Sequence, residues 1–86
     1  MTPAEALESI RRAGISGAFV VSGHARQRMR ERGAGLRDVR NAMATATQCR
    51  AQETGRWRTD GGVDDDGDEL SIVVVFDGGT IVVTLY

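Results

Sequence analysis

Two apolar runs separated by three turn-forming residues place the strongest constraint on how this chain can fold. The runs LSIVVVF and TIVVTLY occupy residues 70–76 and 80–86, and Asp77, Gly78 and Gly79 lie between them. β-Branched and aromatic residues favour extended backbone, and adjacent glycines allow the positive φ angles of a tight hairpin turn. The sequence therefore predicts an antiparallel hairpin with Gly78 and Gly79 as its central residues.

The register of this hairpin decides which residues meet the core. If the two glycines form the loop, Phe76 faces Ile81 and Val73 faces Thr84. Successive residues of a strand point to opposite faces. One face is then wholly apolar and is expected to meet the helices; it carries Ile72, Val74, Phe76, Ile81, Val83 and Leu85.

Two further segments, 48–53 and 56–60, alternate in the same way and are expected to be strands. Alternation points Cys49, Ala51 and Trp57 to the core. The face away from the helices then gathers polar residues from both segments and from the hairpin: Arg50, Arg56, Arg58, Thr84 and Tyr86. A one-residue bulge would change these assignments.

Helix signals fill the first half of the chain. Thr2 and Pro3 suit a helix start, and apolar spacing predicts a helix over 3–13 ended by Gly14. A short strand is expected at 18–21. Ser22 is a good N-cap for a helix that runs to Arg32 and ends at Gly33.

Another helix is expected to begin near Gly35, with Leu36, Val39, Ala42 and Met43 on its core-facing side. Eighty-six residues form one small domain, 1–86. The order of the elements predicts an α+β fold in which an antiparallel sheet carries helices on one face.

The net charge of −1 conceals two opposed blocks. Residues 24–58 hold nine arginines and three acidic residues, a net charge of +6, whereas residues 59–86 hold seven acidic residues and no basic one. The basic block suits a polyanionic partner such as RNA; alternatively, the two blocks neutralise each other within the fold.

The composition also excludes several classes of protein. No apolar run approaches the ~20 residues that a membrane span needs, and the first residues lack a secretory-signal pattern. Cys49 is the single cysteine, which fits a reducing cytoplasm. The segment DDDGDE lacks the ligand spacing of a calcium loop, so we expect no metal and no other cofactor.

The stretch SGHARQRMRERG carries the only histidine and four arginines. His24, Arg28 and Arg32 are spaced by four residues and therefore share one face of the predicted helix. Histidine exchanges protons near neutral pH, so His24 is a candidate acid or base. The structural alternative is that its ring lies close to the sheet backbone and fixes the start of the helix.

Four segments together resemble a known family. HARQRMRERG, LRDVRNAM, DGDELSIVVVF and TIVVTLY are similar to a bacterial domain of unknown function, number 4258, over about Phe19 to Tyr86. That family is often grouped with RelE-like and MqsR-like toxins, small ribonucleases neutralised by antitoxin proteins. The resemblance implies a RelE-like core over 18–86, with residues 3–13 as an added helix.

The resemblance also implies an activity, cleavage of RNA by its own 2′-hydroxyl, with His24, Arg28 and Tyr86 as catalytic residues. Arg32 follows from the same motif as a phosphate-binding residue, and the strand pattern adds Arg50, Arg56 and Arg58. The partners expected are RNA, an antitoxin-like protein or a second copy of the chain. The alternative hypothesis is a non-catalytic protein-binding module that keeps the fold.

Overall fold

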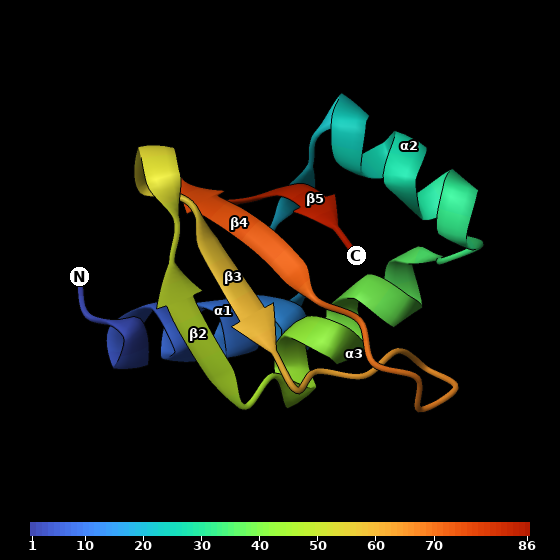
Figure 1. Cartoon of the computed structure of the whole chain (residues 1–86), viewed down its shortest axis with the longest axis horizontal. Coiled ribbons are helices and arrows are strands. Elements are labelled where there is room, and N and C mark those ends of the chain that lie inside the picture. Colours follow the sequence, from blue (N-terminus) through green and yellow to red (C-terminus); the bar gives the residue numbers. More distant parts are fainter.

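The structure, a computed structural model, describes residues 1–86 and contains three α-helices and a five-stranded sheet (Figure 1). The helices are α1 (Pro3–Ser16), α2 (Gly23–Arg32) and α3 (Leu36–Thr45). The strands are β1 (Val20–Val21), β2 (Gln48–Ala51), β3 (Trp57–Asp60), β4 (Ile72–Phe76) and β5 (Thr80–Leu85). A short 3-10 turn, η1 (Glu53–Gly55), joins β2 to β3. The predicted α+β class is confirmed.

The sheet is mixed rather than antiparallel. Its strand order is β1-β5-β4-β3-β2, and every neighbouring pair is antiparallel except β1 and β5. Three of the four strand pairs are antiparallel as predicted, and the parallel pairing of β1 with β5 departs from the prediction.

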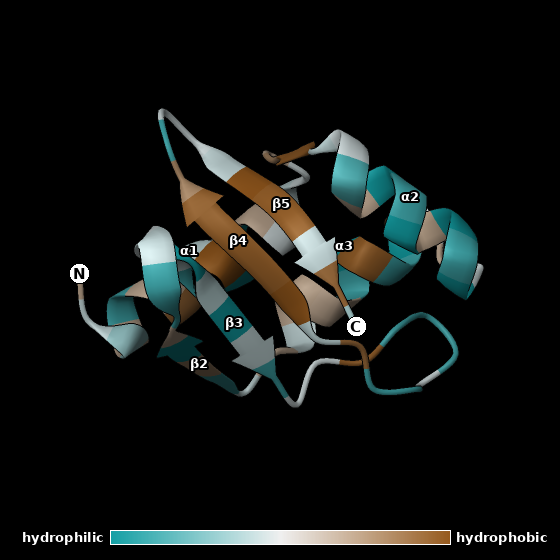
Figure 2. Ribbon diagram, turned by 45° about the horizontal axis from the view of Figure 1, so that its top comes forward, coloured by the Kyte–Doolittle hydropathy of each residue, from teal (hydrophilic) through white to brown (hydrophobic).

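Helices α1 and α3 pack on each other and against one face of the sheet, whereas α2 packs against β5 (Figure 1). The core between these layers is formed by fully buried apolar side chains, the largest of which are Ile10, Met43, Leu70, Ile72 and Leu85. Figure 2 shows this division, with a strongly apolar β4 and a hydrophilic α2.

Local capping signals set the helix boundaries largely as predicted. The Thr2 side chain accepts a hydrogen bond from Glu5 N at 3.2 Å, and the Ser22 hydroxyl accepts one from Ala25 N at 3.1 Å. Gly33 ends α2 with a φ of 66°. The predicted end of α1 at Gly14 is wrong, since the helix continues to Ser16 and ends at Gly17 with a φ of 78°.

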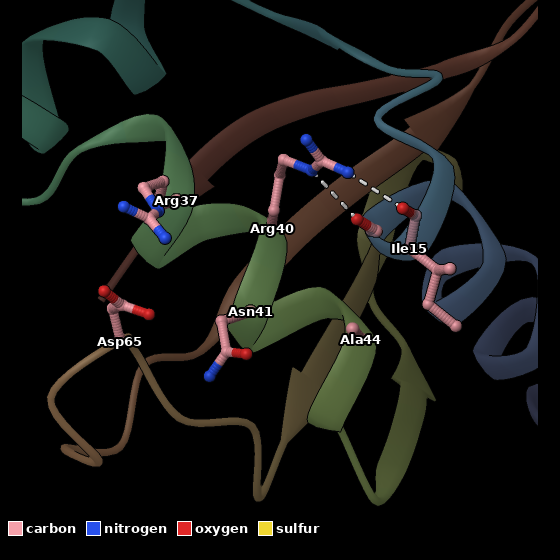
Figure 3. A pocket seen from close by; sticks show the side chains of 7 residues that line it. Ile15, Arg37, Arg40, Asn41, Ala44 and Asp65 are labelled. Carbon is pink, nitrogen blue, oxygen red and sulfur yellow. Dashed lines mark hydrogen bonds between the residues drawn. The ribbon is translucent and has the colours of Figure 1, made fainter.

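Gly14 is buried inside α1 because α3 crosses it closely. A β-carbon at this position would lie 2.7 Å from both Ala44 N and Met43 Cβ, and 2.8 Å from Arg40 O. Arg40 also crosses to α1, where its Nε donates to Gly14 O at 3.1 Å and its Nη2 to Ile15 O at 2.8 Å (Figure 3). These contacts cover the carbonyl end of α1, which carries partial negative charge.

The hairpin differs from the predicted register by one residue near its turn. Phe76 pairs with Thr80, so the loop holds Asp77, Gly78 and Gly79. Further along, Val73 pairs with Thr84 and Val74 with Val82, which makes Val83 the extra residue of a β-bulge. Val82 is therefore buried in the core, and the predicted core positions Ile81 and Val83 are only partly buried.

Two other core predictions also fail. Leu36 is 51% exposed, because it lies in the first turn of α3, beyond the stretch that packs on the sheet. Ala51 is exposed at the end of an edge strand, while Cys49 and Trp57 pack partly against the core as expected.

We predict that Gly14→Ala lowers the free energy of unfolding by about 1–3 kcal/mol, because the added methyl group forces α1 and α3 apart. Gly23→Ala is the matched control, since Gly23 is also helical and a β-carbon there meets nothing within 4 Å. Urea denaturation of both variants measures the difference. Equal stability of the two variants would contradict the close crossing of the helices.

The segment 63–69 is fastened to α3 through Asp38. Its Oδ2 accepts from Gly35 N at 2.8 Å and its Oδ1 from Asp65 N at 3.0 Å. These hydrogen bonds lower the pKa of Asp38 below its ordinary value of 3.8, and the bond from Gly35 has the larger effect. The ionised carboxylate therefore stabilises the fold above that value, and this stabilisation is lost as the pH falls through the lowered pKa.

We predict that Asp38→Asn melts below the wild type at pH 7 and that the two melting temperatures converge as the pH falls through the lowered pKa of Asp38, where the protonated acid resembles the amide. Thermal unfolding across pH 2.5–7 measures this difference. A gap that stays constant down to pH 2.5 would show that the charge of Asp38 is not what stabilises this contact.

Candidate functional site

One row of residues crosses the sheet on the face away from α1 and α3. Arg50 pairs with Arg58, Arg58 with Val73, and Val73 with Thr84. The sequence predicted that Arg50, Arg58 and Thr84 share this face, and the pairings confirm it. The register is correct here because the row lies on the side of the bulge away from the hairpin turn.

Arg58 is the most enclosed arginine of this row, with 28% of its side chain exposed. Its Nε is buried and has no hydrogen-bond partner; the nearest carboxylate oxygen, Oδ1 of Asp60, is 3.7 Å away. The other oxygen of Asp60 lies 3.6 Å from Arg50 Nε. A single carboxylate thus holds two guanidinium groups beside each other.

Two arginine side chains, one from the sheet and one from α2, approach the ring of Tyr86. The Cζ atom of Arg58 lies 4.7 Å from the centre of its ring, and that of Arg28 lies 5.7 Å from it. Such cation–π contacts contribute about 0.5–1 kcal/mol each at exposed sites. Tyr86 is 45% exposed, and its hydroxyl makes no hydrogen bond within the chain.

Arg28 is held in place by three contacts. Its Nε donates to Leu85 O at 3.2 Å, its Nη1 lies 3.3 Å from Glu31, and its guanidinium approaches Tyr86. β1 pairs only with Ile81 and Val82 of β5, so the Leu85 carbonyl has no strand neighbour on this side. We refer to Arg28, Arg50, Arg58, Asp60 and Tyr86 as the arginine–tyrosine cluster.

His24 and Arg32 lie one helical turn before and after Arg28 on the same face of α2. Both side chains are exposed, and neither makes a hydrogen bond within the chain. The expectation that His24 fixes the helix to the sheet backbone is wrong. Ser22 does this instead: its hydroxyl donates to Val83 O at 3.2 Å, and its backbone N–H to Val82 O at 2.9 Å.

Arg56 lies outside the cluster. It precedes β3 in the turn after η1, where its side chain is exposed and forms no ion pair. The structure brings together Arg28, Arg50, Arg58 and Tyr86 of the predicted site. Asp60 was not predicted, although its position two residues after Arg58 in an alternating strand was a usable signal.

Cys49 lies on β2, where its side chain is partly buried against the core. Burial raises the pKa of its thiol to about 11, with a further contribution from the negative charge of Asp60. The nucleophilic form of cysteine is the thiolate, so this residue is poorly suited to act as a nucleophile. No group of three or more His, Cys, Asp or Glu side chains is placed to hold a metal ion.

A comparison with family models matches residues 21–86 to the domain of unknown function DUF4258. The chain belongs to this family. The matched region contains every residue of the arginine–tyrosine cluster together with His24, while α1 of this DUF4258 protein lies before it. The predicted resemblance to this family is thus confirmed, and α1 packs on the matched region through its contacts with α3.

Neither the curated proteins nor the solved structures contain a significant match to the chain. None of its helices combines the length and apolar character needed to cross a membrane.

We predict that Cys49 reacts slowly with thiol reagents in the folded protein. With a pKa of about 11, the thiolate fraction at pH 8 is about 0.1%, roughly 100-fold below that of a thiol with a pKa near 9. Ellman's reagent, applied to native protein and to protein in urea, measures both rates. Equally fast labelling in both states would show that the thiol is not shielded.

Proposed function

We propose that this DUF4258 protein is a toxin-like endoribonuclease with a RelE-like fold, and that the arginine–tyrosine cluster binds the RNA phosphate. The observation that carries the proposal is the meeting of Arg28 and Arg58, from different elements, on the ring of Tyr86. Planar guanidinium groups bind phosphate oxygens with paired hydrogen bonds. The free Tyr86 hydroxyl adds a neutral donor beside them.

Each residue of the proposed site has its own role in the cleavage step. His24 accepts the proton of the ribose 2′-hydroxyl, whose oxygen attacks the adjacent phosphorus. Arg28 and Arg58 stabilise the negative charge that grows on the phosphate oxygens. The bond to the 5′-oxygen breaks, Tyr86 donates a proton to that oxygen, and a 2′,3′-cyclic phosphate remains on the other fragment.

The position of His24 is compatible with this role. It lies four positions before Arg28 in the helix, about 6 Å along the axis and on the same face. Its exposure leaves both ring nitrogens open to a substrate. Arg32 continues the same face beyond Arg28, and Arg50 and Arg56 extend the basic surface along the sheet, so a single strand longer than one nucleotide is the expected ligand.

A second function is favoured by one specific observation. Asp60 already lies beside both Arg50 and Arg58, and Glu31 beside Arg28, so much of the positive charge is compensated within the chain. This arrangement suits a protein-binding module in which the cluster is structural. On either proposal, an acidic antitoxin-like protein is the expected regulatory partner of the remaining arginines.

We predict that the protein binds short single-stranded RNA with a strong dependence on salt. Three engaged arginines give a log–log salt slope of about −2, from ~0.7 per phosphate contact, and Arg28→Gln/Arg58→Gln makes the slope about 1.4 shallower.

His24→Ala is expected to abolish cleavage while binding and melting temperature stay unchanged, because its side chain makes no internal hydrogen bond. Fluorescence anisotropy and gels of labelled RNA measure these effects.

Arg11→Gln/Arg12→Gln removes two arginines from α1, outside the family match, and is the matched control that leaves slope and cleavage unchanged. Melting curves of every variant separate loss of binding from loss of folding. Absence of both binding and cleavage at 25 mM salt would overturn the ribonuclease proposal and leave the protein-binding module.

A further inference from the structure

The face of α2 turned away from Tyr86 carries uncompensated positive charge. Arg26 and Arg30 are one turn apart on this face, both are exposed, and neither forms an ion pair or a hydrogen bond. With Met29 and residues 33–35 they line a shallow hollow at the turn between α2 and α3. None of these residues belongs to the arginine–tyrosine cluster.

The segment Asp64–Glu69 carries the opposite charge. Its five acidic side chains form no ion pair within 4 Å, and Figure 3 shows Asp65 near Arg37 at the rim of a pocket without a bond between them. This segment therefore does not neutralise the arginines of α2 within one chain, and the ion pairs between the two charge blocks are those of Asp60 with Arg50 and Arg58.

Hydrogen bonds hold this acidic segment in a fixed shape. Asp64 Oδ1 accepts from Asp66 N and Asp68 N, both at 2.9 Å, and Asn41 Nδ2 donates to Val63 O and Asp64 O, both at 3.0 Å. Asp65, Asp66 and Asp68 are exposed on this frame. A loop that is already ordered loses little conformational entropy when it docks on a partner.

The two charged surfaces lie at the same end of the molecule. Both views place α2 and the loop before β4 at that end, with the start of α3 between them, and both are strongly hydrophilic (Figures 1 and 2). A two-fold axis that passes between two complementary surfaces brings each one onto its counterpart in the second copy. One chain therefore carries both halves of a self-complementary interface.

We propose that this end of the molecule forms a two-fold symmetric homodimer, in which the acidic segment 64–69 of each copy docks on Arg26 and Arg30 of the other. The occupant of the basic face is thus a second copy of this chain. Each charge contact occurs twice, and exposed ion pairs are weak and screened by salt. The dimer is accordingly weak and dissociates as salt rises.

Sedimentation velocity at about 100 µM protein tests the proposal. In 25 mM NaCl the expected mass is twice the 9.3 kDa of one chain, and in 500 mM NaCl it falls to that of the monomer. Arg26→Glu/Arg30→Glu and Asp65→Lys/Asp66→Lys are each expected to be monomeric in 25 mM NaCl. Arg11→Glu/Arg12→Glu makes the same change of net charge on α1 and remains dimeric.

Mixing the two charge-reversed variants is the decisive arm. In a mixed dimer, Glu at positions 26 and 30 faces Lys at 65 and 66, and the second contact keeps its native pairing, so the dimer mass returns. A monomeric wild type at low salt, a dimeric Arg26→Glu/Arg30→Glu, or a mixture that stays monomeric while both variants melt like the wild type would each overturn the proposal.

Discussion

The hydrogen bonds of Ser22 determine how the start of α2 is attached to β5. The hydroxyl of this residue caps α2 and donates to Val83 O, while its backbone N–H donates to Val82 O. One residue thus ends β1, begins α2 and fastens both to β5. Since β1 is only two residues long, the far half of β5 lacks a strand neighbour on that side. Ser22 and Arg28 donate hydrogen bonds to the carbonyl groups of β5 that a neighbouring strand would otherwise pair with. The bond from Arg28 to Leu85 O also brings the guanidinium group of Arg28 to the ring of Tyr86.

Features that depend on local chemistry could be predicted from the sequence. The caps at Thr2 and Ser22 and the left-handed residue Gly33 follow from the preferences of single residues. Gly14 could not be interpreted correctly in this way, because a glycine that ends a helix and a glycine that admits a crossing helix look alike in sequence. Only the contact with α3 distinguishes the two roles.

The candidate site was predicted in part for a similar reason. Arg50, Arg58 and Thr84 share a face because strand alternation holds on one side of the bulge, and it fails beyond Val83, where Val82 takes the core position. The side-chain contacts of the site depend on tertiary placement. Sequence alone could not show that Asp60 lies beside two arginines, or that His24 remains in solvent while Ser22 fastens the helix.

The attachment of α2 to β5 also bears on how the domain folds and opens. Arg28 and Leu85 are 57 residues apart in sequence, and Ser22 and Val83 are 61 apart, so these contacts, like the pairing of β1 with β5, close long loops of the chain. Ala25 is the only fully buried residue of α2, so this helix can leave the sheet while most of the hydrophobic core stays packed. Opening of α2 separates Arg28 from Tyr86 and dismantles the cluster without unfolding the domain. A ligand that requires both residues therefore binds only the closed form and slows hydrogen exchange in α2 more than in α1 or α3.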